Sequence, residues 1–157
     1  MVYVGVIGAS GRSAPPPQVL AAAEQAGRAL ARAGAVVVCG GGDGVMESVS
    51  RGVADGGGHC VGLLPGARRQ EGNAFLSIAI ATALGDARNA VIVSASDVLI
   101  AIGVGLGTLS EIALALGAGK HVVGLQTWDL LNTHEHMHAA RDPEEAVRLA
   151  LALEGGP

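Results

Sequence analysis

The chain has 157 residues, half of them hydrophobic, and a formal net charge of -4. This length predicts one domain over residues 1–157 with a buried core, and it argues against two domains. The sequence has no basic block of the kind that nucleic-acid surfaces require, and no apolar run reaches the roughly 20 residues of a membrane span. We therefore expect a soluble protein whose partners include neither nucleic acid nor a membrane.

The first residues lack the basic segment and the small-residue cleavage site of a secretory signal. They are expected to form a first strand, and the protein is expected to be cytoplasmic. Cys39 and Cys60 lie inside apolar, strand-like runs, where a cysteine is usually a small buried hydrophobe, so we assign them no chemistry.

In chain order, short apolar runs rich in valine and isoleucine alternate with alanine-rich stretches, which is typical of successive βαβ units. The expected strands are Val2–Gly8, Ala35–Cys39, His59–Leu64, Ser77–Thr82, Val98–Ile102, His121–Leu125 and His136–Ala140. The expected helices are Pro17–Ala33, Gly44–Asp55, Asp86–Ser94, Thr108–Gly117 and Asp142–Leu153. Because most strands are apolar throughout, both faces of the sheet should be covered. The predicted fold is α/β and Rossmann-like, with a doubly wound, mostly parallel sheet of six or seven strands.

The helix ends carry their own signals. Gly34, Gly56 and Gly117 follow helices and are expected to adopt left-handed backbone conformations. Asp142 is expected to cap the last helix, with Pro143 at its first position. The last residues, 155–157, are expected to form a frayed tail.

Three glycine-rich turns follow expected strands and precede expected helices: Gly8–Gly11, Gly40–Gly44 and Gly103–Thr108. In a parallel sheet such turns gather at one edge, where ligands bind, and backbone amides at helix N-termini attract anions. For any one turn, simple tight-turn chemistry is an equally good explanation. Together the three turns predict a phosphate site with these residues: Gly8, Ser10, Gly40, Gly41, Gly42, Gly105, Gly107 and Thr108.

Several cofactor classes are disfavoured. The chain contains neither a complete Walker loop nor a complete dinucleotide fingerprint. Its only lysine, Lys120, precedes an expected strand and so should lie at the edge of the sheet opposite the glycine turns. Pyridoxal phosphate chemistry needs a lysine at the cofactor, so we expect no resident cofactor.

The segments Gly40–Met46, Arg88–Asn89 and Gly105–Glu111 together resemble the LONELY GUY family, formerly mislabelled as lysine decarboxylases. The resemblance covers nearly the whole chain and implies hydrolysis of the N-glycosidic bond of nucleoside 5′-monophosphates to base and ribose 5-phosphate. It also implies that Gly105, Gly107 and Thr108 hold the phosphate, that Glu111 is the catalytic carboxylate and Arg88 its partner. A homodimer or larger assembly is implied as well.

The family hallmark reads P-G-G-x-G-T-x-x-E, and this chain departs from it. Gly103-Val104 stands in place of Pro-Gly, and Asn89 replaces the lysine that follows the arginine in the hydrolases. These residues are more similar to a branch that includes molybdenum cofactor carrier proteins. From the family resemblance, the leading hypothesis is a nucleoside 5′-monophosphate phosphoribohydrolase. The alternative, which these departures favour, is a carrier or sensor that binds a phosphorylated pterin or nucleotide without turnover.

Structural roles compete with these functional ones. Thr108–Glu111 also spells a capping box, in which Glu111 only satisfies a backbone amide. Arg88 is also explained as a solvated helix residue. Asp43 and Glu47 are explained equally well as ligands of a ribose hydroxyl and as acids that favour a helix N-terminus.

The run His134–His138 contains H-E-x-x-H, the zinc protease motif, which requires both histidines on one face of a helix. The helix expected from Asp142 starts too late to include them, so we expect polar residues in a connection or edge strand, and no metal.

Overall fold

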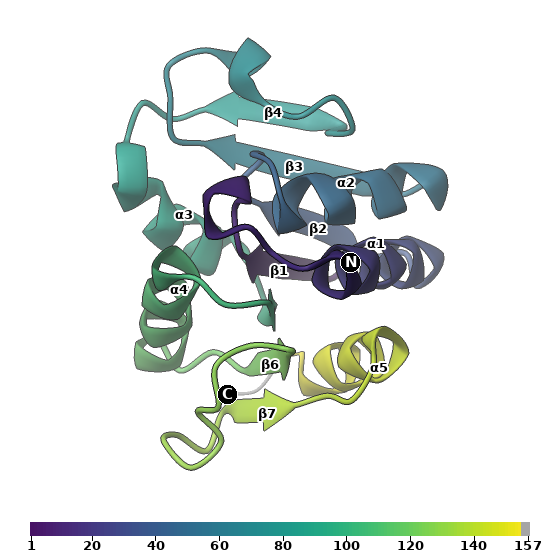
Figure 1. Cartoon of the computed structure of the whole chain (residues 1–157), viewed down its shortest axis with the longest axis vertical. Coiled ribbons are helices and arrows are strands. Elements are labelled where there is room, and N and C mark those ends of the chain that lie inside the picture. The colour runs from purple at the N-terminus through teal and green to yellow at the C-terminus, as the bar shows by residue number, and fades with distance from the viewer. Residues whose placement is uncertain (155–157) are drawn as a thin grey trace.

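The computed structural model describes residues 1–154, in which seven parallel strands form one sheet with helices on both faces (Figure 1). The strands are β1 (Tyr3–Gly8), β2 (Val36–Cys39), β3 (His59–Leu64), β4 (Ile78–Ala81), β5 (Val98–Ile102), β6 (Val122–Leu125) and β7 (Met137–Ala139). The helices are α1 (Pro17–Arg32), α2 (Val45–Asp55), α3 (Arg88–Ala95), α4 (Leu106–Gly117) and α5 (Pro143–Leu153). Short 3-10 helices η1 (Gly11–Ser13), η2 (Arg69–Glu71) and η3 (Gly85–Ala87) interrupt the connections.

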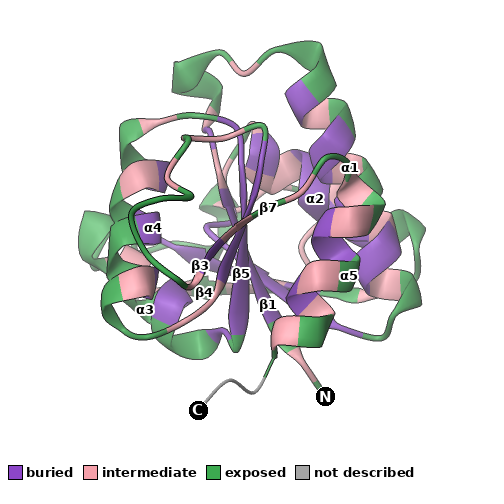
Figure 2. Ribbon diagram, turned by 90° about the horizontal axis from the view of Figure 1, so that it is seen from below, coloured by how far each residue is buried: buried purple, intermediate pink, exposed green. Residues whose placement is uncertain are grey.

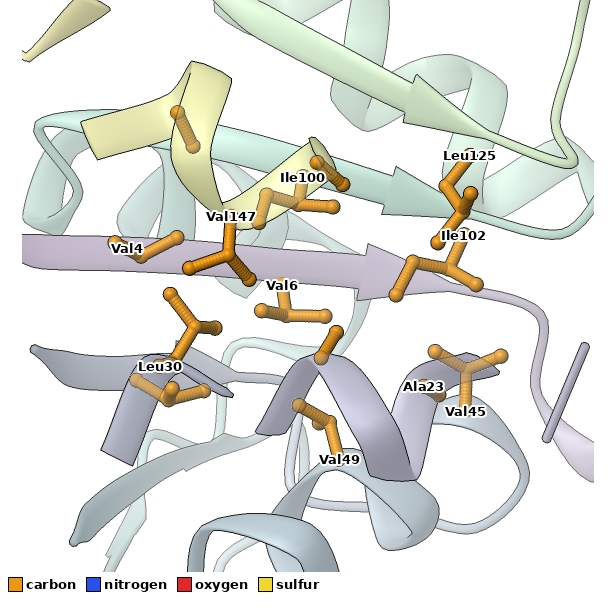
Figure 3. Packing of buried hydrophobic residues seen from close by; sticks show 14 of the residues in the cluster. Val4, Val6, Ala23, Leu30, Val45, Val49, Ile100, Ile102, Leu125 and Val147 are labelled. Atoms are coloured by element: carbon orange, nitrogen blue, oxygen red, sulfur yellow. The ribbon is translucent and has the colours of Figure 1, made fainter. Parts of the chain in front are cut away.

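The two faces of the sheet bury different clusters. Seen along the sheet, α1, α2 and α5 cover one face and α3 and α4 cover the other (Figure 2). On the first face Val6 and Ile100 pack against helix residues such as Leu30, Val49 and Val147 (Figure 3). Because both faces are covered, strands β2, β5 and β6 are buried throughout, as their unbroken apolar runs predict.

Helices α1 and α2 cross at unusually short range. A Cβ added to Gly27 would lie 2.3 Å from the carbonyl oxygen of Val49, and one added to Gly52 would lie 2.0 Å from that of Glu24. Only glycine therefore permits this crossing, which brings α2 and the turn before it close to the sheet.

The strand order β4-β3-β2-β1-β5-β6-β7 places the switch point of the sheet between β1 and β5. From β1 the chain moves outward to β4, then returns to β5 beside β1 and moves outward in the other direction. The turns after β1 and β5 consequently diverge. The space between them lies at the carboxyl ends of the strands, which is where ligands bind in open α/β sheets.

The predicted fold class is confirmed, and each expected strand and helix is present with ends within two residues, β7 included. Asp142 caps α5 as expected, since its Oδ1 accepts a hydrogen bond of 2.8 Å from the amide of Glu145. Lys120 donates to carbonyls at the end of α3, including that of Val93, away from the glycine turns. Residues 155–157, the expected tail, lie outside the described residues.

Two local predictions are wrong. Helix α4 begins at Leu106, not at Thr108, because the extended residue Gly105 already serves as its N-cap. Of the three glycines expected to be left-handed only Gly34 is; the other left-handed positions fall one or two residues later, at Gly57 and Gly119. In residues 1–154, no helix is both long enough and apolar enough to cross a membrane.

Candidate functional site

A pocket of about 180 Å³ opens at the switch point, between the turns that follow β1 and β5. Its wall is built from β1 and the turn after it, the end of β2, the start of α2, η3 with the start of α3, and the first turns of α4. The lining residues are Val6, Ile7, Gly8, Ala9, Ser10, Ser13, Gly40, Met46, Asp86, Arg88, Asn89, Gly105, Gly107, Thr108 and Glu111.

The first turn of α4 presents donors without acceptors. The first bond of the helix runs from the amide of Leu109 to the carbonyl of Gly105, at 2.9 Å. Within the described chain the amides of Leu106, Gly107 and Thr108 have no partner, and no side chain caps them. These three amides, here called the α4 cradle, lie at the positive end of the helix dipole, which is a favourable place for an anion.

The hydroxyl of Thr108 adds a second, independent observation. Thr108 is 2% exposed and lines the pocket, yet its Oγ1 has no hydrogen-bond partner within residues 1–154. Buried hydroxyls are nearly always paired, so an unpaired one beside free amides marks a place suited to a polar ligand. The arrangement is suited to the oxygens of a phosphate.

The capping-box explanation of Glu111 does not hold. Because α4 begins at Leu106, Thr108 lies inside the helix and does not act as its N-cap. Over the described part of the chain, the carboxylate of Glu111 accepts no hydrogen bond and forms no ion pair within 4 Å, although it lines the pocket. Glu111 therefore faces the site with its hydrogen-bonding capacity unused.

Burial is the main influence on the charge of Glu111, which is 7% exposed. Loss of hydration raises the pKa of Glu111 to about 7, Arg88 acts in the opposite direction, and the neighbouring Cys39 adds to the rise. At neutral pH the carboxyl is consequently divided between its neutral and ionised forms.

Arg88 is a half-buried structural tie, not a solvated helix residue. Its Nη1 donates to the carbonyl oxygens of Gly40 and Leu63, at 2.5 and 2.6 Å, and its Nε donates to Oδ1 of Asn89 at 2.9 Å. These bonds join the ends of β2 and β3 to α3. Arg88 thus lines the pocket with two of its five donors directed at backbone and a third at the Asn89 side chain, and within residues 1–154 it forms no ion pair with Glu111.

Eight of the ten residues predicted for the site line this pocket: Glu111, Arg88, Gly8, Ser10, Gly40, Gly105, Gly107 and Thr108. Gly41 and Gly42 do not. The side-chain amide of Asn73 donates to both of their carbonyls, at 3.3 and 3.0 Å, so this half of the second turn is held by the 66–73 loop.

Asp43 and Glu47 also lie outside the pocket lining. Oδ1 of Asp43 accepts a 2.8 Å bond from the amide of Gly11, which connects the turns after β1 and β2. Glu47 pairs with Arg51 at 2.9 Å on the surface of α2. The contacts of both acids are structural.

Ser13, Met46, Asp86 and Asn89 are pocket residues that were not among the predicted site residues. Asp86 and Asn89 lie close to Arg88 in the sequence, so their proximity to a predicted site arginine could have indicated that they line the pocket. Met46 ends the segment Gly40–Met46 that carries the family resemblance, whereas Ser13 has no such signal in the sequence.

The H-E-x-x-H run occupies the β6–β7 connection and edge strand β7, as expected, and not a helix. Nδ1 of His121 and Nε2 of His138 are 2.9 Å apart and form a hydrogen bond. In residues 1–154, no three His, Cys, Asp or Glu side chains are placed to hold a metal ion. The zinc protease geometry is therefore not formed.

Comparison with known proteins gives a family and close structural relatives. Residues 1–152 match the model of the SLOG cluster4 family. The molybdenum cofactor binding protein of Rippkaea orientalis is 38% identical, covers 96% of each chain and superposes with a TM-score of 0.89. The molybdenum cofactor carrier protein of Chlamydomonas reinhardtii is 32% identical, with 97% of each chain covered and a TM-score of 0.87. An uncharacterized protein of Archaeoglobus fulgidus is 39% identical over 97% of this chain and 96% of its own.

Replacing the buried carboxyl tests its environment. The pKa of Glu111 in the folded protein, about 7, lies above its ordinary value of 4.5, so the folded state binds more protons between these values and loses stability as the pH rises through them. We expect Glu111→Gln, which is neutral at every pH, to gain about 3 kcal/mol over the wild type between pH 4.5 and pH 8.

Urea unfolding at both pH values measures this difference. Glu47→Gln, which removes the partly exposed carboxylate of the ion pair with Arg51 on α2, is the matched control and should change the free energy of unfolding by less than about 1 kcal/mol. An equal effect of Glu111→Gln at both pH values would contradict the raised pKa.

Proposed function

Because the chain belongs to the SLOG cluster4 family, within the LOG-like superfamily, we propose that it is a single-domain carrier that binds a phosphorylated pterin of the molybdenum cofactor type. The observation that carries this proposal is the α4 cradle, whose free amides adjoin the unpaired hydroxyl of Thr108. Two relatives of similar length, named for binding or carrying molybdenum cofactor, support the choice of ligand.

The pocket offers groups for both ends of such a ligand. The α4 cradle receives the phosphate, since backbone amides at a helix N-terminus match its charge and geometry. Asp86 and Asn89 line another part of the wall and offer a carboxylate acceptor and an amide. A pterin edge carries adjacent N–H donors and a carbonyl, which these two side chains complement.

The state of Glu111 and Arg88 favours binding over turnover. Cleavage of an N-glycosidic bond requires an ionised carboxylate beside the developing oxocarbenium ion. Burial raises the pKa of Glu111 to about 7, and Arg88 bonds to backbone carbonyls instead of holding Glu111 ionised through an ion pair. The departures at Gly103-Val104 and Asn89 from the hydrolase pattern point the same way.

One observation supports a second candidate function. Glu111 lines the same pocket as the α4 cradle, which is where a carboxylate would stand in a phosphoribohydrolase. Incubation with adenosine 5′-monophosphate, followed by chromatography for free adenine, tests it. The carrier proposal predicts no adenine above the level of a Glu111→Gln control, and release that this substitution abolishes would establish the hydrolase instead.

Gly107→Ala tests the cradle directly. No atom lies within 4 Å of a Cβ added at Gly107, so the methyl group fits without a clash, in the first turn that lines the pocket. It should stabilise α4 by up to about 1 kcal/mol yet weaken binding of molybdenum cofactor at least tenfold, because it occupies the approach to the amides. Fluorescence or ultrafiltration assays with the isolated cofactor measure the affinity.

Gly117→Ala is the matched control, because Gly117 ends the same helix and also has no atom within 4 Å of an added Cβ. It should stabilise the protein similarly and leave cofactor affinity unchanged. Full cofactor binding by a folded Gly107→Ala protein would contradict the proposed position of the phosphate.

We further propose that the protein works as a homodimer or larger homo-oligomer through α3 and α4. Apart from Arg88 and Glu111, both of which line the pocket, these helices carry no charged residue. Val91 of α3 and Leu114 of α4 are exposed, the latter by 45%. An uncharged, exposed apolar face of this kind is typical of an isologous contact between copies of one chain.

Substitution of Leu114 tests this surface. We expect Leu114→Glu to convert the assembly to monomers in sedimentation velocity, because it places one charge per subunit in the contact. Gln25→Glu adds the same charge to an exposed position of α1, on the opposite face of the sheet, and should leave the assembly intact. A monomeric wild-type protein would contradict the proposal.

A further inference from the structure

The pocket combines two features that oppose each other. Its floor is the α4 cradle, a site that favours negative charge, and its wall includes the carboxyl of Glu111, one turn further along the same helix. Glu111 is buried, and its oxygens have no donor or ion-pair partner within residues 1–154. A phosphate bound at the cradle therefore shares the pocket with a carboxyl group that has no ion-pair partner within the described residues.

A bound dianion and an ionised Glu111 would repel each other strongly in such a poorly hydrated place. Burial already raises the pKa of Glu111 to about 7, before any ligand arrives. Near neutral pH the conflict is relieved at little cost by a proton on the carboxyl, which also becomes a hydrogen-bond donor toward the ligand. No covalent bond of the ligand changes, and the proton comes from solvent.

We propose that Glu111 takes up one proton when the α4 cradle binds its anion, so that this buried carboxyl makes the affinity for phosphate esters depend on pH and favours ligand release as the pH rises. This inference rests on the proposed phosphate site, and it gives Glu111 a role in ligand retention that requires no turnover. Glu111 thus makes binding depend on the charge of the complex, and it does not select the heterocyclic base of the ligand.

The other charged or titratable groups around Glu111 do not provide the same effect. Arg88 of α3 is a permanent cation directed at carbonyl oxygens. Asp86 of η3 is an exposed carboxylate at the same pocket. Cys39 at the end of β2 is a buried thiol that contacts Cys60, at 3.8 Å between sulfurs. The lining residues from β1, its following turn and α2 have no titratable side chain.

Inorganic sulfate is the appropriate probe, because it remains a dianion at every pH used, so that any pH dependence of its binding belongs to the protein. An NMR titration from pH 5.5 to 9, which follows the amides of Gly107 and Thr108, reports binding at the cradle itself. We expect a constant dissociation constant below pH about 6 and a rise of about tenfold per pH unit above pH 7, as one linked proton requires.

Glu111→Gln should abolish this slope and bind sulfate at least about tenfold more tightly than the wild type at pH 8.5. Calorimetry at pH 7.5 in two buffers of different ionisation enthalpy should show uptake of about three quarters of a proton by the wild type and none by Glu111→Gln. Glu47→Gln is the matched control: it removes a carboxylate of α2 that lies outside the pocket lining, and it should retain the slope.

The outcomes separate the two proposals. Sulfate that perturbs neither amide, in the wild type or in Glu111→Gln, would overturn the cradle and with it the proposed function. Sulfate that binds the wild type equally at pH 6 and pH 8.5 would overturn the proton-linked role of Glu111 alone. A slope that survives in Glu111→Gln would also overturn that role, and would indicate another group such as Cys39.

Discussion

The unsatisfied first turn of α4 is the constraint on which the site depends. Gly105 is extended, so the chain enters the helix with no side chain positioned to cap it. The turn is fixed from outside instead: Oγ1 of Thr127 donates to the carbonyl of Gly103 at 2.6 Å, and Nε1 of Trp128 donates to that of Gly105 at 3.3 Å. The carbonyls of Gly103 and Gly105 are thereby occupied, and the amides remain available to a ligand. The cradle is ordered when the protein folds, so a ligand does not have to order it on binding.

The same principle extends across the switch point of the sheet. Asp43 holds the turn after β1 through Gly11, and Arg88 holds the ends of β2 and β3. Neither contact requires a ligand, so the walls of the pocket are set before binding occurs. Parallel strands bring these turns to one edge, and side chains from neighbouring turns then lock them in place.

The sequence predicts the architecture well because the short, unbroken apolar runs of the strands differ in hydrophobic pattern from the alanine-rich segments of the helices. It also predicts which glycine turns converge. It fails where long-range contacts decide: the donors of Arg88 go to carbonyls of two strands that a linear pattern does not connect, and Asn73 draws Gly41 out of the pocket. The start of α4 differs by two residues because Gly107 has a low helix propensity, whereas Thr108 falsely suggests a cap.

Glu111 shows how the environment decides the role of a residue more than its motif does. A glutamate one turn after a phosphate site can stabilise an oxocarbenium ion when a neighbouring cation or donor keeps it ionised. Here burial dominates, and the nearest guanidinium is engaged by Gly40 and Leu63. In the same scaffold, an arginine turned toward the carboxylate would keep it ionised and suited to stabilise an oxocarbenium ion, whereas an arginine bound to the backbone would leave the carboxyl able to take up the proton that we propose. Under the proposed function, one hydrogen-bonding arrangement would thus separate ligand retention from turnover without a change in the fold.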